Sequence, residues 1–174
     1  MTSTSSPLLL FYRHQGPDHA GRMLAVLWHL SHEALEQHHD FIQWLFPLPE
    51  PSRALAEAPR LTADDVAAFH DDPTLRHHLR RSLDVMLDFY GMALTQGEEY
   101  HTISPTANAV ERQRTWLTPH NHNFLRLSRI LRSLSLLGER KAGGALLTAL
   151  ETLAAERPEI IGRKTLEYWC EAVA

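Results

Sequence analysis

Prolines mark the ends of the regular segments of this chain and restrict it to a largely helical fold. Pro73 and Pro119 each follow a residue that favours the position just before a helix, whereas Pro47, Pro49 and Pro51 prevent a helix from continuing. Between the prolines, apolar residues recur at spacings of three and four, and few segments alternate as a strand would. The pattern therefore predicts an all-α fold.

The length of the chain predicts one domain. A domain of 174 residues buries roughly 70% of the surface that its unfolded chain exposes, so neither a disulfide nor a metal is needed for a core. We expect a compact single-domain bundle of about seven helices over residues 1–174. Three segments are expected to lie outside the main helices: a lead-in (1–17), a Pro-rich connector (47–61) and an irregular loop region (95–118) with one short helix near 109–114.

Local capping signals predict where several helices begin and end. Asp72 and Pro73 form an N-cap followed by proline at the first helical position, and the apolar face continues to Tyr90. Thr62 and Asp65 form a sequence similar to a capping box. The remaining expected helices include Met23–Trp28, with Asp18 as the cap, and a helix from Ser31 to Phe46. A further helix is expected from Pro119 to Leu137, with Thr118 as its N-cap and Gly138 as its C′ residue. The last two are expected over 139–156, where Gly143 and Gly144 indicate close approach of a neighbouring helix, and over 160–173.

The charges and the single cysteine limit the class of protein. Lys and Arg total 17 against 21 Asp and Glu, and this near balance gives no whole-molecule attraction to DNA or to anionic membranes. Cys170 excludes an intramolecular disulfide and is expected to be a small core residue. The apolar stretch Leu8–Tyr12 is too short for a signal or membrane span. We expect a soluble, cytoplasmic protein with no transmembrane segment, and the excess of arginine over lysine indicates a GC-rich bacterial genome.

The sequence contains 12 histidines, but their spacing does not predict a metal site. Ligands on one helix face need a separation of three or four residues, whereas His38/His39 and His77/His78 are adjacent and point about 100° apart. The chain has no GxSxG motif and no glycine-rich phosphate loop. We therefore expect no metal, no cofactor and no enzyme activity, with a cryptic His-dependent metalloenzyme kept as a third alternative.

Two segments carry candidate binding residues. In the first, His39 and Gln43 share a helix face beside the large apolar surface of Trp44, although core packing explains the same aromatic pattern. In the second, arginines recur every three residues on one helix, where they either form a solvated stripe or bind a carboxylate or phosphate. These arginines are Arg126, Arg129 and Arg132. The same helix begins with His122 and Asn123, whose polar groups are candidates for receiving an anion.

These segments resemble the N-terminal conserved region of the opioid growth factor receptor family. The resemblance rests on HDFIQWLFPLP from His39 to Pro49, FYG from Phe89 to Gly91 and HNFLRLSRILRSL from His122 to Leu134, in that order. It extends over nearly the whole chain. The residues that match family motif positions are His39, Ile42, Gln43, Trp44, Leu45, Phe46, Pro47, His122, Asn123, Arg126, Arg129, Ile130 and Leu131.

The resemblance implies a receptor-like binding protein. Its animal members are known as receptors for the opioid growth factor, the pentapeptide Met-enkephalin, and are associated with the nuclear envelope. The chain has no basic nuclear-localisation run and no long C-terminal extension, so we do not expect nuclear traffic. The hypothesis is a groove for a peptide or another anionic ligand, with His39, Gln43 and Trp44 on one wall and Arg126 and Arg129 as donors. The alternative is a nucleic-acid or phosphate-binding protein that uses the arginines at 126, 129 and 132.

Overall fold

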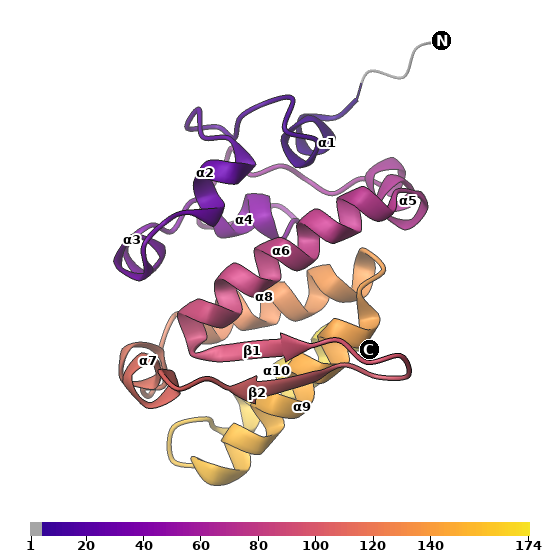
Figure 1. The fold of residues 1–174 in the computed structure, drawn as a ribbon. Helices are drawn as coiled ribbons and strands as arrows, with labels where there is room; N and C mark the ends of the chain where they lie inside the picture. Colours follow the sequence, from indigo (N-terminus) through magenta and orange to yellow (C-terminus); the bar gives the residue numbers. More distant parts are fainter. Residues whose placement is uncertain (1–4) are drawn as a thin grey trace. The chain divides into compact units, whose positions relative to one another are not determined.

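The structure, a computed structural model, describes residues 5–174 and divides the chain into two compact units, Met1–Ser82 and Leu83–Ala174. The predicted single domain over 1–174 stays a prediction. The helices are α1 (Pro7–Tyr12), α2 (Leu24–Trp28), α3 (His32–Gln37), α4 (Ile42–Leu45), α5 (Ala63–Asp71), α6 (Pro73–Tyr90), α7 (Ala109–Trp116), α8 (Asn123–Leu136), α9 (Arg140–Glu156) and α10 (Arg163–Val173) (Figure 1). The strands are β1 (Met92–Thr95) and β2 (Thr102–Pro105).

The described part of the chain is mostly helical, but the all-α prediction omitted a small sheet. β1 and β2 pair antiparallel, with Thr95 opposite Thr102. The hairpin lies partly inside the segment predicted to be irregular, where α7 confirms the expected short helix. Each strand has only four residues, too few for an alternating pattern to be recognised against the helical periodicity around it. The described residues form ten helices instead of about seven because several are only one turn long.

The first unit begins with helices that the sequence pattern did not resolve. The predicted lead-in contains α1, where the hydroxyl of Ser6 accepts a hydrogen bond from the Leu9 amide. Ser31 caps α3 as expected, but the predicted helix to Phe46 is interrupted at residues 38–41. Within that interruption Asp40 bonds the side chain of Arg22, so a tertiary contact replaces continued helix at this point. The first four residues of the predicted lead-in lie outside the described residues.

Of the predicted helix-end signals of α5, α6 and α8, three are confirmed and one is wrong. Thr62 and Asp65 form a reciprocal capping box, and the carboxylate of Asp72 accepts the Thr74 amide at the start of α6. Gly138 has a φ of 87° after α8, as expected for a C′ glycine. The predicted start at Thr118 and Pro119 is wrong, because α8 begins at Asn123. The Pro-rich connector 47–61 contains no helix and one isolated bridge between Leu48 and Arg60, as predicted.

Aromatic side chains dominate the core of the first unit. Phe11 packs edge-on against Trp44, and Tyr12 packs edge-on against Phe69. All four side chains are buried, and the hydroxyl of Tyr12 donates to the carbonyl of Leu45. This burial raises the pKa of Tyr12 despite a hydrogen bond with Ser82. The rings therefore connect α1 to α4 and α5 within this unit.

In the second unit, two tryptophans are fully buried in the core. The indole of Trp116 donates to the carbonyl of Tyr90, and that of Trp169 donates to the carbonyl of Phe124. At Gly143, α9 packs against α8, and an added Cβ would lie 3.6 Å from the Cβ of Leu134, which is an ordinary van der Waals contact. Gly144 has no such neighbour within 4 Å, so the expected close approach holds at one glycine and not at the other.

Candidate functional site

The predicted binding residues are divided between the two units. His39, Gln43 and Trp44 belong to the first unit, and His122, Asn123, Arg126 and Arg129 belong to the second. The structure describes the surroundings of each set within its own unit. Their meeting in one groove stays a prediction.

In the first set, only His39 is exposed. Gln43 and Trp44 lie in α4 and are 3% and 4% exposed. The amide of Gln43 donates from Nε2 to the carbonyl of His39, whereas its Oε1 is buried without a hydrogen-bond partner in the described part of the chain. Gln43 and Trp44 are therefore part of the core, which agrees with the alternative explanation that the aromatic pattern reflects core packing.

A polar network lies beside Trp44 and includes residues that sequence reasoning did not select. The indole of Trp44 donates to Nδ1 of His19 at 3.1 Å, and Nε2 of His19 lies 3.3 Å from Oδ2 of Asp40. Because an indole nitrogen only donates, Nδ1 must be the unprotonated nitrogen of a neutral His19, and Nε2–H then donates to Asp40. Arg22 donates from Nη1 to the other oxygen of Asp40 at 3.1 Å. Asp40 thus joins two segments of the first unit by charge-assisted contacts.

Asp18 anchors the far side of the same network. It was predicted to cap a helix, but α2 begins at Leu24 and Met23 is its N-cap residue. The carboxylate of Asp18 instead accepts the backbone amides of Ala20 and Arg22 at 2.9 and 2.8 Å. It also accepts Nε of Arg22 at 2.7 Å, and its side chain is fully buried. Asp18 therefore stabilises a loop rather than a helix.

The pKa of Asp40 predicts a stability effect that depends on pH. Burial alone would raise this pKa, but the hydrogen bond and the positive charge of Arg22 outweigh it and hold the pKa below its usual value of 3.8. A carboxylate with a lowered folded-state pKa stabilises the fold above the unfolded-state pKa, and that stabilisation is lost as the pH falls through the folded-state value.

We expect Asp40→Asn to lower the free energy of unfolding by about 1–2 kcal/mol at pH 7. Urea denaturation at pH 7 and at several values below 3.8 checks this expectation. The difference between the two proteins should shrink across the acid range because the wild-type carboxylate becomes protonated there. A difference that stays constant with pH would contradict the assigned role of Arg22.

The second set does not form a single solvated stripe. Arg126 is only 5% exposed and donates from Nη1 to Oδ1 of Asn123, which is itself fully buried. Arg129 is half-buried and Arg132 is exposed. His122 is exposed at the N-cap position of α8, and its side chain makes no capping hydrogen bond. The arginines therefore extend from the interior of the unit to its surface.

The histidines also gather around Trp28. The rings of His14 and His78 lie 5.3 and 5.6 Å from it, and the two imidazoles lie 4.8 Å apart. Burial, followed by the charge of His78, lowers the pKa of His14. Nδ1 of His78 donates to the carbonyl of Tyr12 at 2.7 Å. Across residues 5–174, no three or more His, Cys, Asp or Glu side chains are arranged to hold a metal ion.

Cys170 is not the core residue that the sequence predicted. It is exposed on α10, with Sγ 3.9 Å from a carboxylate oxygen of Glu151. Desolvation raises the pKa of the thiol, and the negative charge of Glu151 raises it further. A thiol held in its protonated form is a poor nucleophile.

Among the helices of residues 5–174, none combines the length and the apolar character of a membrane span.

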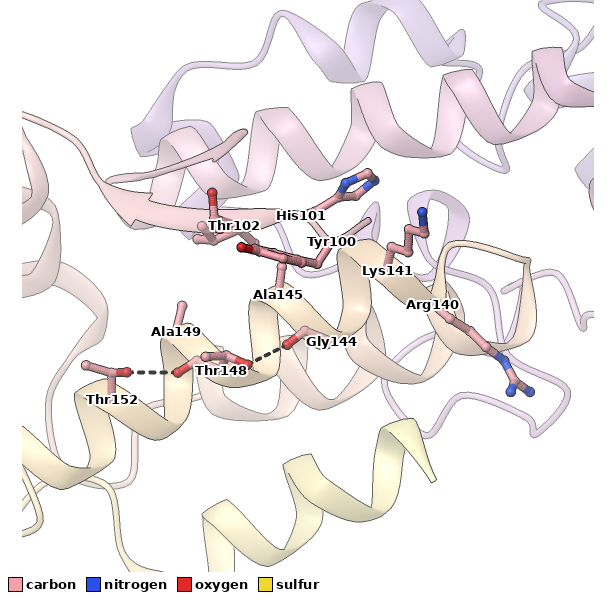
Figure 2. A pocket seen from close by; sticks show the side chains of 11 residues that line it. Tyr100, His101, Thr102, Arg140, Lys141, Gly144, Ala145, Thr148, Ala149 and Thr152 are labelled. Atoms are coloured by element: carbon pink, nitrogen blue, oxygen red, sulfur yellow. Dashed lines mark hydrogen bonds between the residues drawn. The ribbon is translucent and has the colours of Figure 1, made fainter. Parts of the chain in front are cut away.

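An open groove in the second unit was not foreseen. It lies between the hairpin segment 100–103 and α9, and its volume is about 580 Å³. Figure 2 shows Arg140 and Lys141 at one end of the groove and Thr152 at the other, with the ring of Tyr100 above Ala145. We call it the β2–α9 groove. The sequence signal that could have indicated it is the series of small residues at every fourth position of α9, Gly144, Thr148 and Thr152, which lie on one helix face.

The charges of the β2–α9 groove are of one sign. Arg140 and Lys141 line it, and none of the residues that line it is acidic. Lys141 donates to the backbone carbonyl of Glu98 at 2.7 Å, whereas Arg140 is exposed. Figure 2 shows the side chains of Arg140 and Lys141 leaving the same end of the groove in different directions, so they give that end a positive charge without forming one paired clamp. A carboxylate or phosphate is the group that such an end attracts.

Comparisons with known proteins place these features in context. Residues 12–174 match the family described as the opioid growth factor receptor (OGFr) conserved region. The opioid growth factor receptor of Mus musculus is 34% identical over 84% of this chain and 23% of its own length, and that of Homo sapiens is 33% identical over 84% and 21%. Opioid growth factor receptor-like protein 1 of Xenopus tropicalis is 31% identical over 82% of this chain and 27% of its own length. The chain thus spans about a quarter of the length of these relatives, and no solved structure matches it.

Proposed function

Because the chain belongs to the opioid growth factor receptor family, we propose that it is a binding module and not an enzyme. Its proposed ligand is a short peptide of the Met-enkephalin type or another anionic ligand. The proposal is supported by one observation above all, the positive end of the β2–α9 groove. Arg140 and Lys141 lie there with no acidic side chain among the residues that line it. A guanidinium offers paired N–H donors that match a carboxylate.

The family blocks contribute to the proposal in different ways. Arg126 and Asn123 are buried together, so they hold the first turn of α8 in place. His122 is exposed and Arg129 is half-buried, so these two residues are the better candidates for contact with a ligand in that block. In the first block, His39 is the exposed candidate beside the buried Gln43 and Trp44.

Calorimetric titration tests the proposed function. We expect Met-enkephalin or a short acidic peptide to bind the wild-type chain, and Arg140→Ala to weaken binding about fivefold to tenfold because one charge-assisted contact is lost. Arg163→Ala is the matched control, since Arg163 is an exposed arginine on α10 that pairs with Glu167 and does not line the groove. Absence of binding by both peptides, or equal weakening by the two variants, would contradict the proposal.

A further inference from the structure

The outer edge of β2 is available for pairing. The sheet has two strands, so in the described chain β2 has a strand neighbour on one side only. The amide of Thr106 donates to the carbonyl of Gly91, and these residues are opposite each other in the register of the hairpin. Hydrogen-bonded and non-hydrogen-bonded pairs alternate along an antiparallel ladder, so the backbone N–H and C=O of Ile103 point away from β1. Ile103 also lines the β2–α9 groove.

The floor of the groove is made of slim side chains that leave room for a chain. A Cβ added at Gly144 would meet no heavy atom within 4 Å. The hydroxyl of Thr148 donates to the carbonyl of Gly144, and that of Thr152 donates to the carbonyl of Thr148 (Figure 2). Their hydroxyl hydrogens are thus used within α9. The floor therefore has small side chains and offers no free hydroxyl hydrogen from Thr148 or Thr152 to a ligand.

The two ends of the groove differ in charge, which gives a bound chain a direction. Arg140 and Lys141 lie at one end, and Thr152 lies at the other. Tyr100, whose side chain is largely exposed, provides an aromatic wall over Ala145 between these ends. Pro105 has no amide hydrogen, so pairing along the edge of β2 is limited to a short stretch around Ile103.

We propose that the β2–α9 groove binds a short extended peptide, which pairs with the Ile103 edge of β2 and places a carboxylate beside Arg140 and Lys141. The peptide lies over Gly144, where no heavy atom would meet an added Cβ within 4 Å. Main-chain hydrogen bonds to a sheet edge supply affinity, and the positive end selects for the carboxylate. The inference rests on the proposed function and goes further, because it assigns the site, the conformation of the peptide and the position of its charge.

The test fills the groove and compares chemically matched peptides. Gly144→Leu adds a side chain to the open floor, whereas Ala155→Leu places the same side chain at an exposed position of α9 that does not line the groove. The probes are Met-enkephalin with a free C-terminal carboxylate, its C-terminal amide, and a form with a methylated backbone nitrogen at its central residue. We expect Gly144→Leu to weaken binding of the free acid at least tenfold and Ala155→Leu to change it less than twofold. The amide and the methylated peptide should each bind the wild-type chain more weakly than the free acid.

The outcomes separate this inference from the proposed function. Circular dichroism and thermal melting should show Gly144→Leu as folded as the wild type, because the position is open and a helical glycine is removed. Undiminished binding of the free acid by Gly144→Leu overturns the groove assignment and leaves the proposed function standing. Equal binding of the free and methylated peptides overturns strand pairing. If the wild-type chain binds neither this peptide nor a short acidic peptide, both proposals fall.

Discussion

Replacing Asp18 with alanine is expected to lower the free energy of unfolding by about 3–5 kcal/mol. The change leaves two backbone amides without their acceptor and removes a buried charge from beside Arg22. Asp40 would remain as a partner of Arg22, but it contacts the guanidinium through Nη1 alone. Breaking a buried pair by removing one partner is costly because the other charge stays in a poorly hydrated place. Urea denaturation at pH 7 measures the loss.

Two further variants separate the charge from the hydrogen bonds. Asp18→Asn keeps an oxygen that accepts the amides of Ala20 and Arg22, so it should lose less stability than the alanine variant. Asp71→Ala removes an exposed carboxylate elsewhere in the same unit and should change stability by at most about 0.5 kcal/mol. A loss as small for Asp18→Ala as for Asp71→Ala would show that the loop does not depend on this carboxylate.

Gly91→Ala is expected to destabilise the second unit by about 3 kcal/mol, from a left-handed backbone and a steric clash together. Gly91 has a φ of 77°. A Cβ at this position would lie 2.7 Å from the Cα of Ala109 and 3.0 Å from the Cβ of Arg112. Because Ala109 presents backbone, the crowding is relieved only by moving α7. Thermal melting followed by circular dichroism measures the effect.

Gly21 provides a matched control for the backbone part of this cost. Its φ of 79° is nearly the same, and an added Cβ meets nothing within 4 Å. Gly21→Ala should therefore cost about 1–2 kcal/mol, the price of the left-handed conformation alone. Equal losses in the two glycine variants would mean that α7 moves aside freely and that the close approach at Gly91 has no energetic weight.

Sequence reasoning located several helix ends that depend on neighbouring residues, although it placed the start of α8 too early, at Thr118 and Pro119. The capping box at Thr62 and Asp65, the N-cap at Asp72 and the C′ glycine at Gly138 all follow from contacts within a few positions. It failed between α3 and α4, because the contact of Asp40 with Arg22 joins positions 18 residues apart. No local pattern contains that information.

The family was predictable from the sequence, but the burial of its motif residues was not. The resemblance was confirmed by the family match, whereas the predicted binding residues stay predictions. Periodicity placed Arg126, Arg129 and Arg132 on one helix, yet it does not determine that Arg126 is buried and Arg132 exposed. The β2–α9 groove was not predicted because one of its walls is a hairpin of four-residue strands, which the sequence pattern did not indicate. Without that hairpin, the face of α9 gives no sign that it lines a groove.

The four tryptophans also make the two units optically distinguishable. Trp28 and Trp44 in the first unit have imidazole rings beside them, from His14, His78 and His19. Trp116 and Trp169 in the second unit instead donate to backbone carbonyls. Each unit therefore holds its own pair of tryptophans, and replacing the pair of one unit with phenylalanine leaves the emission of the other unit alone. The chain thus carries an intrinsic reporter for each unit and needs no attached dye.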